Sequence, residues 1–187
     1  MTDSIAYSLS MRTEEQDSAQ EDWISRLCLQ CGLCCNGVLF ADVRLQKGDD
    51  ALALEAVGLK LKREPASVRF IQPCSCLTGH LCTIYENRPV CCRQFDCHTL
   101  KQARNGEVGK GKALRRIRLA TEQSNRIKGL LRLLGNGDEH VALTKRYQAV
   151  MSQPIDLVAG EEHAKALGEL ILGVNDLMHC LHRDFLQ

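Results

Sequence analysis

Clustered cysteines are the feature that most restricts how this chain can fold. The 187 residues include 11 cysteines. Ten of them lie in two clusters, one in the segment CLQCGLCC at residues 28–35 and one within residues 74–97. Because the total is odd, a scheme of fully paired disulfides would leave at least one thiol over. The function of this chain therefore depends on what the clustered thiols are for.

The N-terminal segment bears on the redox environment of these thiols. Its first 23 residues have one basic residue, Arg12, and no run of seven apolar residues, which is not the pattern of a secretory signal peptide. No stretch approaches 18 apolar residues, so we expect no membrane helix and a cytoplasmic protein. In a reducing compartment, clustered cysteines more often bind metal or carry out redox chemistry than form structural disulfides.

The first cluster has the spacing of a metal-binding loop. Cys28, Cys31 and Cys34 are separated by two residues each, and a C-x-x-C turn lets two thiolates reach one ion. This run is similar both to a zinc knuckle arm and to the first three ligands of a bacterial ferredoxin cluster. A fourth ligand must come from Cys35 or from the second cluster. Because adjacent side chains diverge, we expect Cys34 and Cys35 to serve different sites or to bridge two.

Metal is also the expected organiser of this half of the chain. Few bulky apolar residues lie between residues 28 and 97, whereas a structural zinc site can add roughly 10–16 kcal/mol of apparent folding free energy. For Cys180, which lies alone in an apolar helical pattern, we expect a buried thiol that acts as a small hydrophobic side chain.

Two motifs in this order resemble the CxxCxxCC (YkgJ-type) family of zinc- or iron-chelating domains. They are CxxCxxCC at residues 28–35 and PCxxL at 73–77 followed by CxIYxxRPxxCRxF at 82–95. The resemblance implies eight ligands, namely Cys28, Cys31, Cys34, Cys35, Cys74, Cys82, Cys92 and Cys97. Cys76 and Cys91 are additional to the family pattern and are less favoured as ligands. Eight thiolates would fill two four-coordinate sites, or one cluster and one ion.

Several side chains beside the ligands have expected supporting roles. Arg88 and Arg93 could donate hydrogen bonds to thiolate sulfur, and Tyr85 and Phe95 are expected to pack over the metal module. Two histidines next to ligand cysteines could replace one of them in coordination, namely His80 and His98.

The remaining sequence predicts a mainly α fold. We expect a polar tail and the start of a first helix in residues 1–22, an irregular cysteine-rich metal-binding module with short strands in 23–100, and a helical part of the same compact body in 101–187. Apolar spacing predicts helices in four segments, namely 49–59, 114–134, 138–151 and 160–182. The residues expected on their inward faces are, in this order, Leu52, Ala56 and Leu59; Leu114, Ile117, Ala120, Ile127, Leu131 and Leu134; Val141, Thr144, Tyr147 and Met151; and Ala164, Leu167, Ile171, Val174, Met178 and Leu181. A short strand is expected at 37–43, an extended piece at 82–85, and a helical turn opening at Pro89.

The sequence favours a metal-binding protein with no catalysis of its own and with zinc ahead of iron. The alternatives are an iron–sulfur redox component and an accessory module of a modifying enzyme, since a similar module accompanies a protein-lysine methylating enzyme. A catalytic thiol at Cys76 or Cys91 is a weaker hypothesis. Metal ions are the expected partners, with a protein partner left open.

A nucleic-acid-binding zinc module is a further alternative. The formal net charge is only +1, so no overall field attracts nucleic acid or membranes. Residues 101–132 nevertheless hold ten basic side chains against Glu107 and Glu122. We favour a solvated helix face as the interpretation of this excess.

Overall fold

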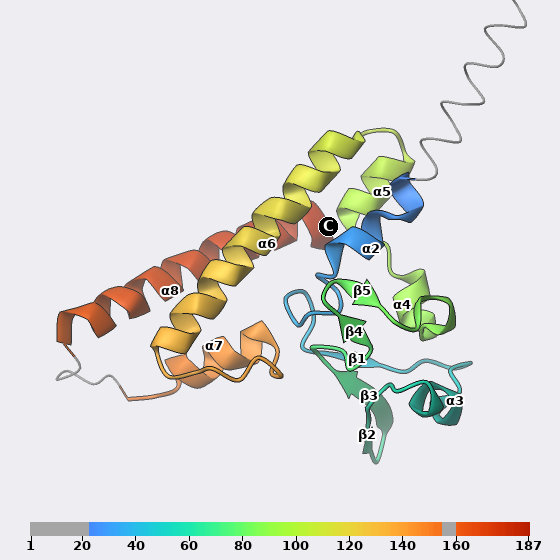
Figure 1. Cartoon of the computed structure of the whole chain (residues 1–187), viewed down its shortest axis with the longest axis horizontal. Helices are drawn as coiled ribbons and strands as arrows, with labels where there is room; N and C mark the ends of the chain where they lie inside the picture. The colour runs from blue at the N-terminus through green and yellow to red at the C-terminus, as the bar shows by residue number, and fades with distance from the viewer. Residues whose placement is uncertain (1–22, 155–159) are drawn as a thin grey trace, which may run out of the picture.

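The computed structural model describes residues 23–154 and 160–187 and has a small cysteine-rich part beside long helices (Figure 1). The elements are α2 (Leu27–Cys31), β1 (Asp42–Arg44), α3 (Ala51–Ala56), β2 (Leu61–Glu64), β3 (Ser67–Ile71), β4 (Leu77–Thr78), β5 (Leu81–Cys82), the 3-10 helix η1 (Tyr85–Asn87), α4 (Val90–Gln94), α5 (His98–Arg104), α6 (Lys110–Leu133), α7 (Leu143–Met151), α8 (Gly160–Leu181) and the π-helix η2 (His182–Leu186). The expected mainly α fold, with short strands in the cysteine-rich half, is confirmed. The first helix expected before residue 23 lies outside the described residues.

Two small antiparallel sheets stiffen the cysteine-rich part. The first has the strand order β1-β3-β2, with Phe70 opposite both Val43 and Leu61, and the second is the hairpin β4-β5. Phe70 is buried with Leu54 in a core that belongs to this part alone. The expected strand begins at residue 42 instead of 37, because residues 37–39 form hydrogen bonds within their loop and to α7.

The inward faces expected for α3 and α7 are wrong. In α3 we expected Leu52 inward, but 74% of it is exposed and Leu54 is buried instead. The helix ends at Ala56, so the buried Leu59 follows a turn and does not share a helical face with Leu52. In α7, the helix begins five residues later than expected. Its inward residues are Leu143, Arg146 and Val150, while the expected Val141, Thr144 and Met151 are exposed.

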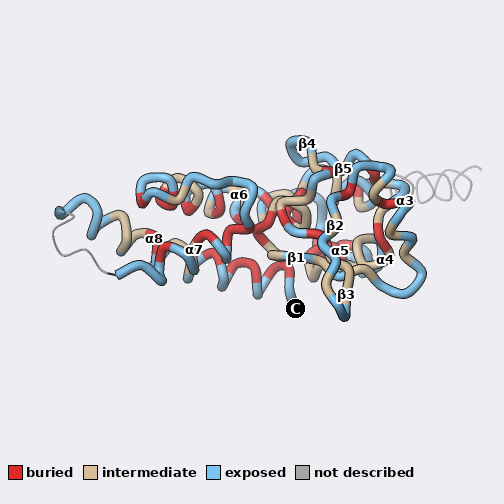
Figure 2. The backbone as a smooth tube through the Cα atoms, turned by 90° about the horizontal axis from the view of Figure 1, so that it is seen from below, coloured by how far each residue is buried: buried red, intermediate tan, exposed pale blue. Residues whose placement is uncertain are grey.

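The long helices α6 and α8 pack against each other, and their buried residues lie on facing sides (Figure 2). The expected inward positions of α6 are confirmed from Ile117 to Leu134. In α8 the apolar arc is wider than the face that α6 covers. As a result, Leu170 and Leu177 are buried, whereas Ile171 and Met178, which were expected to face inward, are exposed.

Apolar packing and a backbone hydrogen bond join the cysteine-rich part to these helices. Leu27, Leu33 and Val38 are buried in the same apolar cluster as Ile117 and Leu181. The backbone N–H of Leu143, at the start of α7, donates to the carbonyl of Gly37 at 2.9 Å. In the described residues, no helix combines the length and hydropathy needed to cross a membrane.

Candidate metal centre

The cysteine-rich part surrounds a cavity of ≈ 390 Å³. All eight cysteines expected as ligands line this cavity, and Cys91 lines it too. Cys76 does not: its side chain is buried in the small core, with Sγ 4.0 Å from the carbonyl oxygen of Val57. Cys180 is also buried, in the helical core, as expected. All eleven cysteines are free thiols.

The first cluster is shaped by α2 and the turn that ends it. Gly32 adopts φ +67° there, and its carbonyl accepts hydrogen bonds from the N–H groups of Cys35 and Asn36. A left-handed residue at this position lets the chain reverse after Cys31, which places four cysteines on two successive turns. Cys97, at the start of α5, lies far away in sequence but packs against the same apolar core as Cys28 and Cys31.

The second cluster is assembled by the β4-β5 hairpin and α4. Cys82 lies opposite Leu77 in the hairpin, and the N–H of Leu77 donates to the carbonyl of Cys74. Pro89 precedes the first turn of α4, as expected, and that turn carries Cys92. Cys74, Cys82 and Cys92 all pack against the small core of the cysteine-rich part.

Cys34 and Cys35 differ in their contacts with the other cysteines. The backbone N–H of Cys74 donates to the carbonyl of Cys35 at 2.8 Å, which ties Cys35 to the second cluster. Burial, followed by Cys82 among the neighbouring thiols, raises the pKa of Cys35 to about 11. The pKa of Cys34 is raised well above its ordinary value by burial and then by Cys31. The two adjacent thiols thus interact most strongly with different cysteines.

The side chains around the cavity include nine thiols, which as thiolates are ligands for zinc and iron. Burial, the largest cause, raises the pKa of Cys31 to about 12 and that of Cys74 to about 12. Such thiols stay neutral near pH 7 unless a cation stabilises the thiolate, and a bound metal supplies that charge. Within the described residues, however, no three His, Cys, Asp or Glu side chains converge closely enough to hold an ion. Binding therefore requires the thiols to turn toward one another.

Arg88 is the main positive group beside these thiols. Its Nε donates to the carbonyl of Tyr85 at 2.8 Å, and its guanidinium lies 3.6 Å from the centre of the Tyr85 ring. Its charge opposes the pKa increase that burial causes at Cys28 and Cys35. Arg93, in contrast, is exposed and does not line the cavity.

Of the other expected supporting residues, some line the cavity and one does not. Phe95 packs edge to face against Phe40 with ring centroids 5.1 Å apart, and both rings line the cavity. His80 lines the cavity, whereas His98 does not. Phe40 was not expected at this site, because nothing in the local sequence pattern relates it to the second cluster.

Comparison with known proteins bears on the same segment. Residues 27–113 match the family model CxxCxxCC, described as a putative zinc- or iron-chelating domain. The match confirms the resemblance found in the cysteine motifs and extends it through α5 to the start of α6. No curated protein and no solved structure matches the chain.

Proposed function

We propose that this protein binds two metal ions, zinc in preference to iron, through two groups of four cysteine thiolates. The first group is Cys28, Cys31, Cys34 and Cys97. The second group is Cys35, Cys74, Cys82 and Cys92.

The observation that carries this proposal is the division of the cavity-lining cysteines between two cores. Three members of the first group pack against the helical core, and three members of the second group pack against the small core. Cys34 and Cys35 each complete one group, because the side chains of adjacent residues diverge. The hydrogen bond from the backbone N–H of Cys74 to the carbonyl of Cys35 favours the second group for Cys35. Burial and then Cys31, Cys35, Cys97 and Cys28 raise the pKa of Cys34, so three of the four thiols that act on it belong to the first group.

The proposed metal sites have a structural role. Zinc, when bound, would neutralise thiolates and join segments that are distant in sequence. The first group would fasten α2 to the start of α5, and the second would fasten the β4-β5 hairpin to α4. The cysteine-rich part has only a small core of its own, so metal ligation would supply much of its folding free energy. Arg88 would reduce the electrostatic cost of assembling negative thiolates beside it.

Elemental analysis of serine variants tests both the metal and the grouping. The protein is purified without added metal, and the metal content per chain is compared for the unmodified protein, Cys97→Ser and Cys92→Ser. We expect about two zinc ions in the unmodified protein and about one in each variant, since a four-thiolate site rarely survives the loss of one ligand. Cys76→Ala is the matched control, because Cys76 belongs to the same segment but does not line the cavity. Loss of both ions from each single variant would refute two independent sites.

An iron–sulfur cluster in the first group is the second candidate function. The C-x-x-C-x-x-C spacing favours it, and so does the cavity, because ≈ 390 Å³ is more space than two bare ions need. In that case the protein would act as a redox component or an accessory module of a modifying enzyme. Anaerobic purification followed by a visible absorption spectrum and a labile sulfide assay distinguishes the two candidates, because thiolate zinc sites are colourless and contain no sulfide.

A further inference from the structure

We propose that a hollow between α6 and the C-terminal turn η2 binds the phosphate group of a small phosphorylated molecule. This inference is independent of the metal centre. The hollow has a volume of ≈ 310 Å³. Its lining consists of four cationic side chains, one apolar side chain and one carboxylate, namely Lys112, Arg115, Arg116, Arg183, Leu119 and Asp184.

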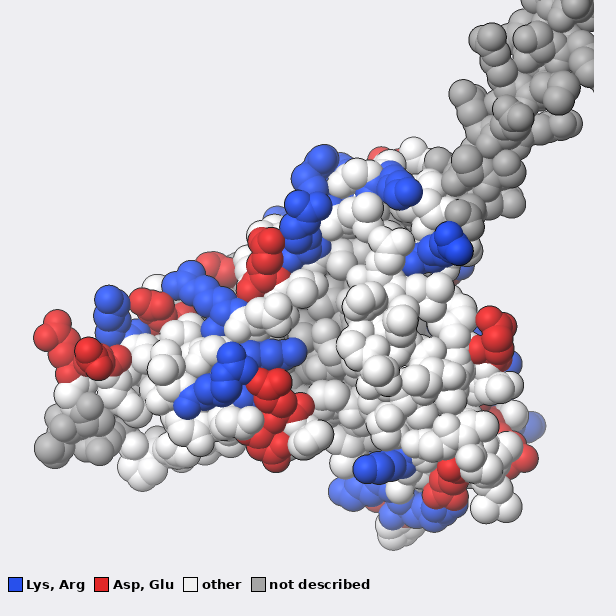
Figure 3. Space-filling view, in the orientation of Figure 1, with Lys and Arg blue, Asp and Glu red and all other residues white. Residues whose placement is uncertain are grey.

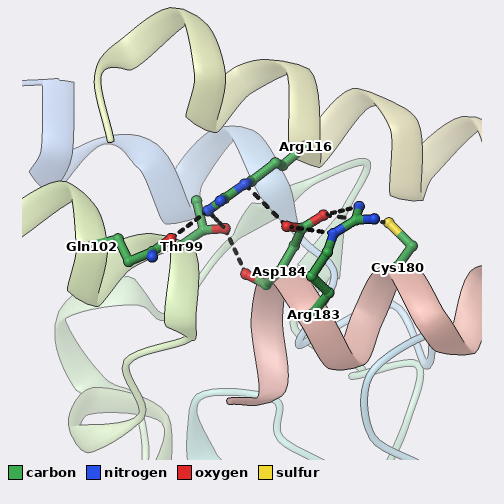
Figure 4. Close-up of polar contacts among 6 residues, drawn as sticks. All are labelled: Thr99, Gln102, Arg116, Cys180, Arg183 and Asp184. Atoms are coloured by element: carbon green, nitrogen blue, oxygen red, sulfur yellow. Dashed lines mark hydrogen bonds and ion pairs between the residues drawn. The ribbon is translucent and has the colours of Figure 1, made fainter. Parts of the chain in front are cut away.

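Two of the arginines are held in place by the carboxylate (Figure 4). Asp184, which is 2% exposed, contacts Nε of Arg116 at 3.1 Å and accepts from Nε and Nη2 of Arg183 at 3.2 and 2.6 Å. Nη1 of Arg116 also donates to Thr99 and Gln102 on α5. These contacts fix the two guanidinium groups before any ligand arrives, which lowers the entropic cost of binding an oxyanion.

The positive charge in the hollow exceeds what Asp184 can neutralise. Within the described part of the chain, neither Lys112 nor Arg115 has an acidic partner. Lys112 lies three and four positions before Arg115 and Arg116 on α6, where like charges on a helix repel each other. An anion bound among these side chains would remove that repulsion. Guanidinium groups also match the oxygen atoms of phosphate in geometry.

The arrangement of charge favours one phosphate group over a nucleic-acid backbone. Figure 3 shows basic side chains over the N-terminal part of α6, with acidic and basic side chains mixed towards its other end. Arg126 pairs with Glu169, and Arg132 pairs with Glu139. The basic segment found in the sequence is thus interrupted by ion pairs, whereas binding along a nucleic acid requires a continuous positive track. The volume of the hollow lies near the lower limit of small-molecule pockets, about 300 Å³.

Titration with inorganic phosphate at constant ionic strength tests the proposal. Binding is followed by ³¹P NMR line broadening on the full chain with the metal that it retains on purification. We expect saturable binding that becomes at least about tenfold weaker in the double variant Lys112→Ala/Arg115→Ala, because the variant removes two charged hydrogen-bond donors to the phosphate. The matched control is Arg118→Ala, since Arg118 is an exposed basic residue of the same helix that does not line the hollow. The control should bind phosphate like the unmodified protein.

Three results would overturn the proposal. The first is no saturable binding up to about 10 mM phosphate, which is weaker than most specific sites. The second is equal weakening in the double variant and in Arg118→Ala, which would indicate a diffuse positive surface. The third is binding of a single-stranded DNA of about ten nucleotides that inorganic phosphate does not displace from the hollow, which would assign this surface to nucleic acid.

A conservative variant separates positioning from direct contact. Asp184→Asn retains the shape of the side chain and one acceptor oxygen, but it removes the charge that holds both arginines. If Asp184 positions the arginines, phosphate binding weakens in this variant although a negative charge has been removed from the hollow. A stronger affinity for phosphate in Asp184→Asn would instead show that only the net charge matters.

Discussion

Replacing Asp184 with alanine should destabilise the protein far more than replacing its exposed partner Arg183. Asp184 is a buried carboxylate that joins α6 to the C-terminal turn, and the side chain of Arg116 beside it is only 16% exposed. In Asp184→Ala, Arg116 becomes a largely buried cation without a carboxylate partner. Removing one partner of a buried ion pair costs about 3–5 kcal/mol. Because Arg116 keeps its bonds to Thr99 and Gln102, we expect the lower end, about 3 kcal/mol.

Arg183→Ala provides the comparison within the same network (Figure 4). The Arg183 side chain is 64% exposed, and its loss leaves Asp184 paired with Arg116. Exposed ion pairs contribute about 1 kcal/mol or less. The two variants should therefore differ by about 2 kcal/mol in the free energy of unfolding.

Urea denaturation near pH 7, followed by far-UV circular dichroism at equal metal content, measures this difference. In thermal unfolding, the loss in Asp184→Ala corresponds to a Tm decrease of roughly 6–12 °C for a chain of this size. The reasoning is refuted if Asp184→Ala loses no more stability than Arg183→Ala.

The pH dependence of this contribution follows from the pKa of Asp184. Burial acts to raise this pKa, but the hydrogen bond from Arg183 and the charges of Arg116 and Arg183 outweigh burial and lower it. The native state therefore binds the proton less tightly than the unfolded chain does. The stabilising contribution is complete above the unfolded pKa of about 4 and disappears as the pH falls through the lower, native pKa. The difference between the unmodified protein and Asp184→Ala should narrow in that acidic range.

Three further predictions concern the cysteine-rich part. Gly37→Ala should lower the free energy of unfolding, measured in urea, by at least about 1 kcal/mol more than Gly135→Ala does. Both glycines have φ near +80°, but only at Gly37 would the new Cβ lie 3.0 Å from the backbone of Ala142. Equal costs would show that the contact with α7 yields easily. The metal-free protein should lose thermal stability as the pH rises above about 8.5 toward 12, because burial raises the native pKa of Cys31 and Cys74 above the unfolded value; a flat anaerobic Tm profile would contradict this. Removal of metal by a chelator should increase amide hydrogen exchange in residues 27–97 much more than in α6 and α8, and uniform protection would argue against a structural metal.

The sequence alone predicted features that depend on neighbouring residues. The spacing of the first cysteine cluster fixes a tight turn, and the 3.6-residue periodicity of α6 fixes its buried side. Both follow from backbone geometry within a few turns of chain. The family motifs added the expectation of eight ligands, and these eight cysteines do line one cavity.

Only the tertiary structure decided features that depend on which segments meet. The apolar arc of α8 is wide enough for two orientations, and the position of α6 selects Leu177 over Met178 for burial. The burial of Asp184 is equally invisible in sequence, because its partner Arg116 is 68 positions away. Likewise, the adjacency of Cys34 and Cys35 in the sequence predicts only that their side chains diverge. Which cysteines each one meets depends on the packing of two separate cores, since contacts between distant segments are set by the three-dimensional fit of side chains and not by local periodicity.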